Sequence, residues 1–250
     1  MFSRILTAAA AITVTAVAGD FNAIVLKQIE SMPQGGGYAT TRAAHDALQS
    51  SVRIESGGVR IRPELSVPSY CSGATYLVFL KAVGELQRRG QIRLSRETWE
   101  ALRPQRLADG HGVWGRWNAN GPGTARLVHE LEMGRSFTSF EEARPGDFLK
   151  IFWTDAVGKK ERGHLVVYLG TETIDGVEHV RFWSSNKPAG FGQKSVPRTE
   201  VARALFTRIE APERLERAAG LPKSDSYLAG LLQNESSFAE ALRLSGVPRG

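Results

Sequence analysis

The sequence contains a single cysteine, Cys71, among its 250 residues. One cysteine cannot form an intramolecular disulfide, and it leaves no set of thiolates for a cysteine-rich zinc site. The five histidines include no pair at four-residue helical spacing beside a carboxylate, so we expect no metal. A lone cysteine therefore needs its own explanation, either as a small buried apolar side chain or as a nucleophile.

Long hydrophobic runs are also missing. The apolar stretch at residues 5–17 is much shorter than the ~20 residues that a membrane-spanning helix needs. Arg4 precedes it and Ala16-Val17-Ala18 ends it, which is the three-part pattern of a signal peptide. We therefore expect residues 1–18 to be a signal peptide and the protein to be exported, to the periplasm or outside the cell. The alternative is a buried amino-terminal helix.

Nucleotide-binding and nucleic-acid-binding motifs are absent as well. The glycine-rich segment 31–38 is not followed by the Gly-Lys-Ser/Thr of a phosphate-binding loop, so we expect no nucleotide cofactor. The basic run 87–96 is typical of a solvated helix end. A net charge of +6 nevertheless favours an anionic partner, and a cell-wall polymer or an anionic lipid would suit it as well as nucleic acid.

Composition and periodicity predict a globular α+β protein. With 42% hydrophobic and 23% charged residues, the chain is neither disordered, collagenous nor a coiled coil. Helical patterns come first and period-two patterns follow from residue 141, which favours helices packed on an antiparallel meander. We expect one domain over residues 19–210 and a helical extension over 211–250. The expected helices are 41–52, 69–83, 95–102 and 124–133, and the expected strands are 148–154, 163–170, 177–185 and 204–210.

Residues 109–123 combine five glycines with two tryptophans and a histidine. We expect an ordered loop, because the segment has too little periodicity for a regular element and too many aromatics for a solvated linker. His111 is the histidine of this loop that we expect to touch a substrate. Trp114 and Trp117 either cap the core or stack on sugar rings, and Arg116 between them suits a substrate carboxylate.

Cys71 stands at the start of the predicted central helix, which is apolar on nearly every side. Amides of the first helical turn and the positive end of the helix dipole lower the pKa of a thiol placed there. The same amides can bind the oxyanion of a tetrahedral intermediate. His164 opens the strand HLVVYLG and is our candidate for the base that a nucleophilic cysteine requires.

A third group should orient the imidazole of that base. The next predicted strand ends in Trp183-Ser184-Ser185-Asn186, where a side-chain oxygen could accept a hydrogen bond from the second ring nitrogen. Asn186 is the preferred candidate. Ser184 and Ser185 remain open because the strand register is unknown at this stage.

Three segments resemble the NlpC/P60 and CHAP cysteine peptidases. They are Tyr70–Gly73 (YCSG) at a helix start, Arg144–Phe148 (RPGDF) at a strand start, and Gly163–Gly170 (GHLVVYLG). The resemblance covers roughly residues 69–186 and is carried by the order of the three blocks. It implies a papain-like fold, a cysteine–histidine–polar triad and hydrolysis of an amide bond in peptidoglycan.

The chain departs from that family pattern at two positions. Tyr70 stands where an aspartate commonly precedes the cysteine, which makes Tyr70 a candidate substrate contact and leaves the bond cleaved open. The third triad position is often histidine, and here it would be Asn186 or a serine. The leading hypothesis is an exported thiol hydrolase acting on cell-wall peptides. The alternatives are a non-catalytic cell-wall-binding module of the same fold and a hydrolase of lipid or acyl amides.

Overall fold

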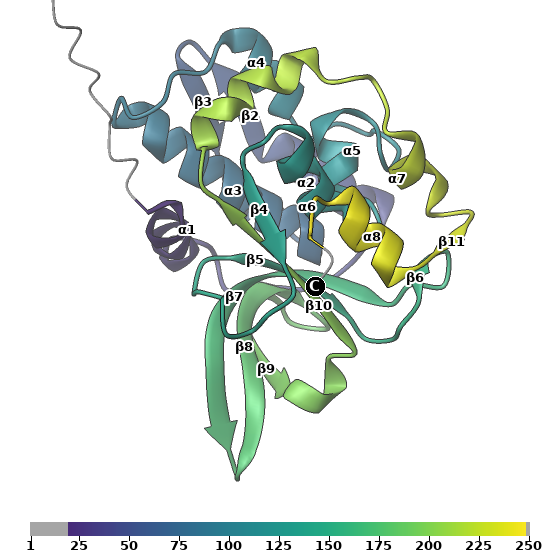
Figure 1. The fold of residues 1–250 in the computed structure, drawn as a ribbon. Coiled ribbons are helices and arrows are strands. Elements are labelled where there is room, and N and C mark those ends of the chain that lie inside the picture. Colours follow the sequence, from purple (N-terminus) through teal and green to yellow (C-terminus); the bar gives the residue numbers. More distant parts are fainter. Residues whose placement is uncertain (1–19, 249–250) are drawn as a thin grey trace, which may run out of the picture.

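Helices cover one side of a seven-stranded antiparallel sheet in the computed structural model, which describes residues 20–248 (Figure 1). The predicted signal peptide lies outside the described residues. The helices are α1 (Phe21–Glu30), α2 (Arg42–Ser50), α3 (Cys71–Arg88), α4 (Arg96–Leu102), α5 (Gly112–Asn118), α6 (Gly123–Glu130), α7 (Ser226–Gly230) and α8 (Phe238–Leu244), with 3-10 turns η1 (Pro63–Leu65), η2 (Arg198–Glu200) and η3 (Pro212–Gly220). Within the described chain, no helix has the length and apolar character needed to cross a bilayer.

The main sheet has the order β1-β9-β8-β7-β5-β10-β4. Its strands are β1 (Gly35–Gly36), β4 (Gly134–Phe137), β5 (Phe148–Phe152), β7 (Gly163–Ile174), β8 (Val177–Asn186), β9 (Gly190–Pro197) and β10 (Arg203–Ile209). Two small ribbons pair β2 (Val52–Glu55) with β3 (Gly58–Ile61) and β6 (Val157–Gly158) with β11 (Glu235–Ser236).

The four predicted strands are confirmed, but their predicted order is wrong. β9 was not predicted, and it takes the place beside β8 that the meander assigned to residues 204–210. β10 instead returns to pair with β5 on the other side of β7. This crossover brings together strands about fifty residues apart, which local periodicity cannot reveal.

Helix α3 lies at the centre of the fold and packs against β7 and β8. Every residue from Ser72 to Val83 except Lys81 is buried, as expected for a helix that is apolar all round. Along β7, Leu165 and Val167 join the core beneath α3, whereas Val166 and Tyr168 join a second core on the other face. This period-two alternation follows directly from strand geometry.

The segment 109–123 is not the loop that its glycines suggested. It contains helix α5, whose Val113, Trp114 and Trp117 are buried in the main core. Gly115 allows α5 to pack closely against the preceding chain, because a Cβ at this position would collide with the backbone carbonyl of Ala108. The glycine therefore marks a tight helix–chain contact and does not interrupt the helix.

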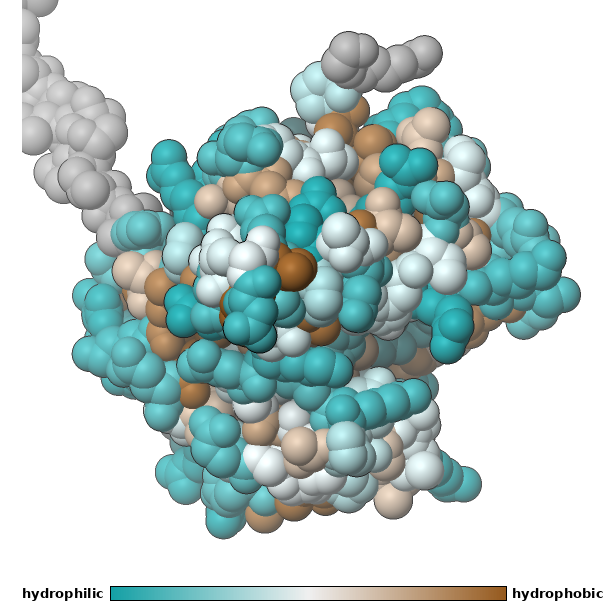
Figure 2. Space-filling model, turned by 90° about the horizontal axis from the view of Figure 1, so that it is seen from below, coloured by the Kyte–Doolittle hydropathy of each residue, from teal (hydrophilic) through white to brown (hydrophobic). Residues whose placement is uncertain are grey.

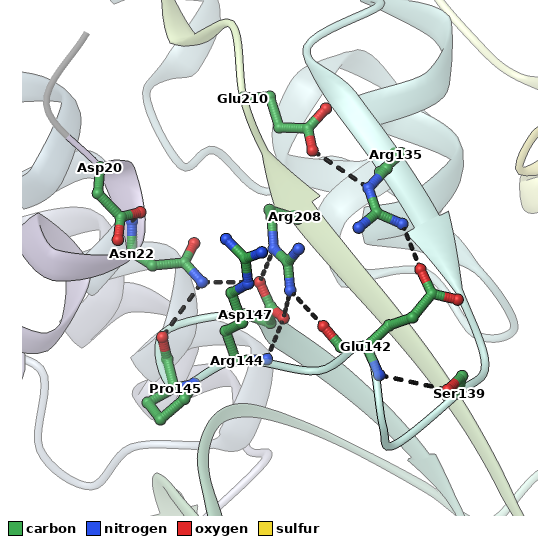
Figure 3. Close-up of polar contacts among 10 residues, drawn as sticks. All are labelled: Asp20, Asn22, Arg135, Ser139, Glu142, Arg144, Pro145, Asp147, Arg208 and Glu210. Carbon is green, nitrogen blue, oxygen red and sulfur yellow. Dashed lines mark hydrogen bonds and ion pairs between the residues drawn. The ribbon is translucent and has the colours of Figure 1, made fainter.

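The Asp147 carboxylate ties α1 to the sheet (Figure 3). Asp147 is fully buried and accepts hydrogen bonds from Arg208 Nε at 2.8 Å and Nη2 at 2.6 Å. Asn22 Nδ2 of α1 donates to the same carboxylate at 2.7 Å and to the carbonyl of Pro145 at 3.1 Å. The aspartate of the RPGDF block is thus a structural anchor between α1, β5 and β10.

The C-terminal residues form short elements that wrap the helical side of the molecule (Figure 1). Leu215 of η3 enters the main core, Leu228 of α7 packs with Ala119, and Ala241 of α8 packs with Phe152. The segment expected to be a helical extension thus contains η3, α7 and α8, together with the short strand β11. The face seen in Figure 2 is mostly hydrophilic, with apolar side chains scattered over it.

Candidate active site

Cys71 is the first residue of α3. The N-cap residue, Tyr70, makes no side-chain capping bond, and the first intrahelical bond to its carbonyl comes from the amide of Ala74. The amides of Cys71, Ser72 and Gly73 therefore have no partner within the helix, which is the ordinary state of a first turn. They form an electropositive helix end around the thiol.

His164 and Asn186 face each other across two neighbouring strands. The register that pairs Val167 with Trp183 places His164, three residues earlier, opposite Asn186, three residues later. His164 Nε2 lies 3.0 Å from Asn186 Oδ1. An amide oxygen can only accept, so Nε2 carries the proton and Nδ1 is left for the cysteine.

The orientation of the Asn186 side chain is set by its own hydrogen bonds. Its Nδ2 donates to the carbonyls of Gly192 at 2.9 Å and Ser184 at 3.4 Å, which turns Oδ1 toward the imidazole. The two serines that the sequence left open are engaged elsewhere. Ser184 donates to the carbonyl of Leu165, and Ser185 accepts a bond from Ser69. The third residue against His164 is therefore Asn186.

The local environment lowers the pKa of the Cys71 thiol to about 6. Burial acts in the opposite direction and would raise it. It is outweighed by a hydrogen bond from His164 and the charge of its imidazole, by the backbone N–H of Leu165, and by the positive charge of Lys150. Because an ordinary thiol titrates near ~8.5, Cys71 is largely thiolate at neutral pH.

Tyr38 is a further residue at the thiol. Burial, together with the nearby Cys71 thiolate, raises the pKa of its phenol. The phenol is therefore a neutral donor over the whole physiological range. Tyr38 is the last residue of the glycine-rich segment 31–38, whose strand β1 pairs with β9 at the edge of the sheet.

Two cavities meet at the cysteine–histidine pair, and each is lined by only one of the two residues. The thiol-side cavity, of about 230 Å³, is lined by Cys71, Ser72, Asp109, Asn118 and Lys150, among others. The imidazole-side cavity, of about 490 Å³, is lined by His164 and Asn186. Tyr38, Glu161 and Gly163 border both. The two cavities therefore adjoin at these three residues, with Cys71 on one side and His164 on the other.

A buried ion pair forms part of the shared wall. Lys150 Nζ lies 2.6 Å from Glu161 Oε1, and the Glu161 side chain is only 1% exposed. Glu161 Oε2 accepts backbone bonds from Gly121 at 2.6 Å and Gly158 at 3.2 Å. The carboxylate therefore joins the turn before α6 to strand β6 and holds the lysine near the thiol.

Asp109 brings a second carboxyl group into the thiol-side cavity. Asn118 Nδ2 donates to it at 2.9 Å, and Asn118 Oδ1 accepts from the Ser72 hydroxyl at 2.6 Å. Burial raises the pKa of Asp109. This relay of three side chains fixes α5 and its preceding turn against the start of α3.

Two of the five predicted substrate contacts border the thiol-side cavity, but both have structural partners. Tyr70 is buried, and its hydroxyl lies 2.8 Å from His45 Nδ1. Trp117 donates from Nε1 to Thr75 at 3.3 Å and stacks on Phe79 with ring centres 4.8 Å apart. Trp117 is also only 1% exposed, so the structure favours the alternative in which it caps the core over stacking on a sugar ring.

The prediction for Arg116 is wrong. Its side chain is fully buried, and its guanidinium pairs with Glu130 and donates to the carbonyls of Gly110, Gly112 and Pro222. All five N–H groups are thus used inside the protein. An arginine in this arrangement holds the turn around α5 together and has no donor left for a substrate.

Trp114 and His111 likewise lie away from the reactive atoms. Trp114 is buried, with its ring centre 4.9 Å from that of Tyr76 and 6.3 Å from that of Tyr70. His111 forms a backbone bridge with Ser224 and lies against the carbonyl of Asp109. Neither residue lines the two cavities, so the predicted substrate-binding role is corrected to a packing role for Trp114 and a turn role for His111.

Tyr38, Asp109, Lys150 and Glu161 were missed by the sequence analysis. The available signals were local: Lys150 is the one charged residue in the strand FLKIF, and Tyr38 directly follows three glycines. Neither signal indicates that these residues lie beside Cys71.

Among residues 20–248, no three His, Cys, Asp or Glu side chains converge as a potential metal site.

Replacing Asn186 with alanine should lower kcat by roughly 10²-fold, because His164 loses the acceptor that selects its tautomer and orientation. Steady-state kinetics of the purified variant, with circular dichroism to verify folding, measure the effect. Ser185→Ala is the matched control, because that serine bonds Ser69 and not the imidazole. An equal loss of kcat in both variants would contradict the positioning role of Asn186.

Comparison with protein-family models, curated proteins and solved structures finds no match for this chain. The function is therefore argued from the site alone.

Proposed function

We propose that this protein is a cysteine hydrolase of the papain-like type that cleaves an amide bond. The observation that carries the proposal is the arrangement of a thiol of lowered pKa at a buried helix start, an imidazole close enough to lower that pKa, and an amide oxygen on the second ring nitrogen. These are the nucleophile, the base and the orienting group that acyl transfer requires.

The first half of the reaction forms an acyl-enzyme. Nδ1 of His164 takes the thiol proton, and the Cys71 thiolate attacks the amide carbonyl from the thiol-side cavity. First-turn amides of α3 stabilise the oxyanion. The imidazolium, held by Asn186, then protonates the departing nitrogen, so the C–N bond breaks and an amine leaves.

The second half releases the acyl group. A water molecule enters on the side vacated by the amine, and His164 removes its proton as the oxygen attacks the thioester carbonyl. The tetrahedral intermediate collapses, the C–S bond breaks and a carboxylic acid leaves. The thiolate and the protonated imidazole are restored for the next cycle.

We further propose that the amide belongs to peptidoglycan. The support is the resemblance of three blocks to NlpC/P60 and CHAP peptidases, the signal-peptide pattern at residues 1–18, and the basic net charge, which suits an anionic wall polymer. The structure brings two of these blocks together at the candidate site, since one carries Cys71 and another carries His164. The third, RPGDF, supplies the Asp147 anchor.

The test is mass spectrometry of purified peptidoglycan after digestion with the protein and with its Cys71→Ala variant. New fragments from the unmodified protein alone are the expected result, and their masses identify the bond. Identical digests from two folded proteins would contradict hydrolysis of the wall. Binding of peptidoglycan without new fragments would then favour a binding module. Hydrolysis of lipid or acyl amides would instead assign the protein a different substrate class.

A further inference from the structure

Under the proposed function, the two cavities would take the two halves of a cleaved substrate. This assignment rests on the proposed function, because the thiolate bonds to the acyl carbon and the imidazole protonates the departing nitrogen. Cys71 lines only the thiol-side cavity, and His164 lines only the imidazole-side cavity. The acyl part therefore occupies the thiol side, and the leaving amine occupies the imidazole side.

The imidazole-side cavity has an excess of positive charge. Arg162, Lys187 and Lys194 line it, and all three side chains are exposed at its rim. Over residues 20–248, none of the three makes an ion pair with a carboxylate. Of the two acidic residues in the lining, Glu161 is neutralised by Lys150, which leaves Glu200 against three cations.

The thiol-side cavity has a different electrostatic character. Besides the Cys71 thiolate, its charged groups are Lys150 and Glu161, which pair with each other, and Asp109, whose burial raises its pKa. No surplus of cations faces the thiol-side cavity among the described residues. The positive excess is therefore confined to the side where the amine product leaves.

Flat aromatic side chains form the walls between these cations. Trp153 lines the imidazole-side cavity and lies nearly parallel to the His164 ring, with centres 6.3 Å apart. Lys187 Nζ lies 5.3 Å from the centre of the Tyr38 ring, a cation–π contact that holds the ammonium near the scissile position. A small anion bound here would sit on an apolar wall and face several donors.

We propose that the imidazole-side cavity selects leaving amines that carry an anionic group, a carboxylate or a phosphate, through Arg162, Lys187 and Lys194. The three residues come from two separate segments of the sheet, the start of β7 and the end of β8 with β9. Removing all three should weaken recognition of an anionic amine by about tenfold, the combined effect expected of three solvent-exposed charges at low salt.

A binding measurement tests the anion site without any turnover. The Cys71→Ala protein is titrated at low salt with N-acetylglycine and with N-acetylglycinamide. Binding is followed by NMR through the indole N–H resonance of Trp153, which is assigned with the Trp153→Phe variant. We expect the carboxylate to shift the signal and the amide to bind at least tenfold more weakly. Equal affinities for the two probes would overturn the proposal.

The same titration is repeated with two triple variants of equal net charge. Arg162→Gln/Lys187→Gln/Lys194→Gln removes the proposed site, and Lys27→Gln/Arg53→Gln/Lys223→Gln removes three exposed cations elsewhere. The Kd for N-acetylglycine should rise about tenfold in the first and stay unchanged in the second. An equal change in both would show a general effect of net charge and would overturn the assignment.

Acyl transfer then tests whether the site accepts the amine product. Cys71 is acetylated with p-nitrophenyl acetate, and the thioester is offered alanine, O-phosphoethanolamine or alaninamide at equal concentrations of free amine. The reverse of amine departure uses the same cavity, so the anionic acceptors should react about tenfold faster than alaninamide. The faster of the two anions shows whether a carboxylate or a phosphate is preferred.

The outcomes separate the two proposals. Equal capture of all three amines would overturn the leaving-group assignment. Absence of a Cys71-dependent acetyl-enzyme would instead contradict the proposed hydrolase, and the indole titration would still decide whether the cavity binds anions.

Discussion

Replacing His164 with alanine should raise the pKa of Cys71 from about 6 to at least the ordinary value of ~8.5. The hydrogen bond and charge of the imidazole are the main contributions that lower this pKa, and burial, which raises it, remains in the variant. At pH 6.5 the thiolate fraction should fall about 75-fold, from roughly three quarters to roughly one hundredth. The alkylation rate should fall by a smaller factor, because a thiolate of higher pKa is the stronger nucleophile. Iodoacetamide kinetics followed by mass spectrometry measure the change.

His164→Ala should also reduce the kcat for amide hydrolysis by roughly 10⁴-fold, because both proton transfers of the reaction pass through the imidazole. His179→Ala is the matched control, since that ring contacts the carbonyl of Val177 at the far end of β8. Alkylation that keeps its midpoint near 6 in the His164 variant would show that another group activates the thiol.

Arg208→Met should destabilise the fold by about 3–5 kcal/mol, because it leaves the Asp147 carboxylate buried without its cation. Asn22 and the backbone N–H of Arg144 would still donate to that carboxylate, but neither supplies a compensating charge. Urea denaturation at neutral pH gives the loss in the free energy of unfolding.

Arg135→Met provides the comparison within the same region (Figure 3). Arg135 pairs with Glu142 and Glu210 at the surface, where both carboxylates are about half exposed. Its loss should cost no more than ~1 kcal/mol. Asp147→Leu added to Arg208→Met should recover part of the stability, and failure to recover any would contradict the account of an uncompensated charge.

The part of the site that the sequence could predict consists of strong local signals. Cys71 begins a stretch that is apolar on nearly every side, which is typical of a central, buried helix. His164 begins a strand with clear period-two alternation. Asn186 required the strand register, which the sequence left open between three residues. The register follows from side-chain packing on both faces of the sheet and not from the strand itself.

The errors have a common physical origin in tertiary contacts that local periodicity does not encode. Gly115 looked like a loop residue, but it is required where α5 approaches the Ala108 carbonyl. Arg116 looked like a substrate contact because its partner Glu130 and the carbonyl of Pro222 are distant in sequence. Tyr38 directly follows the edge strand β1, and Lys150 lies on the interior strand β5. No spacing rule joins either residue to Cys71.

The central claim is that Cys71 is an activated thiol, and the pH dependence of its alkylation tests this most directly. The rate of carbamidomethylation of Cys71 by iodoacetamide is measured between pH 4.5 and 9.5 on the intact protein, with Cys71→Ala as the blank. The account predicts a rate that rises through a midpoint near pH 6 and is level above neutrality. A midpoint at ~8.5 or above, the behaviour of an unactivated thiol, would contradict it.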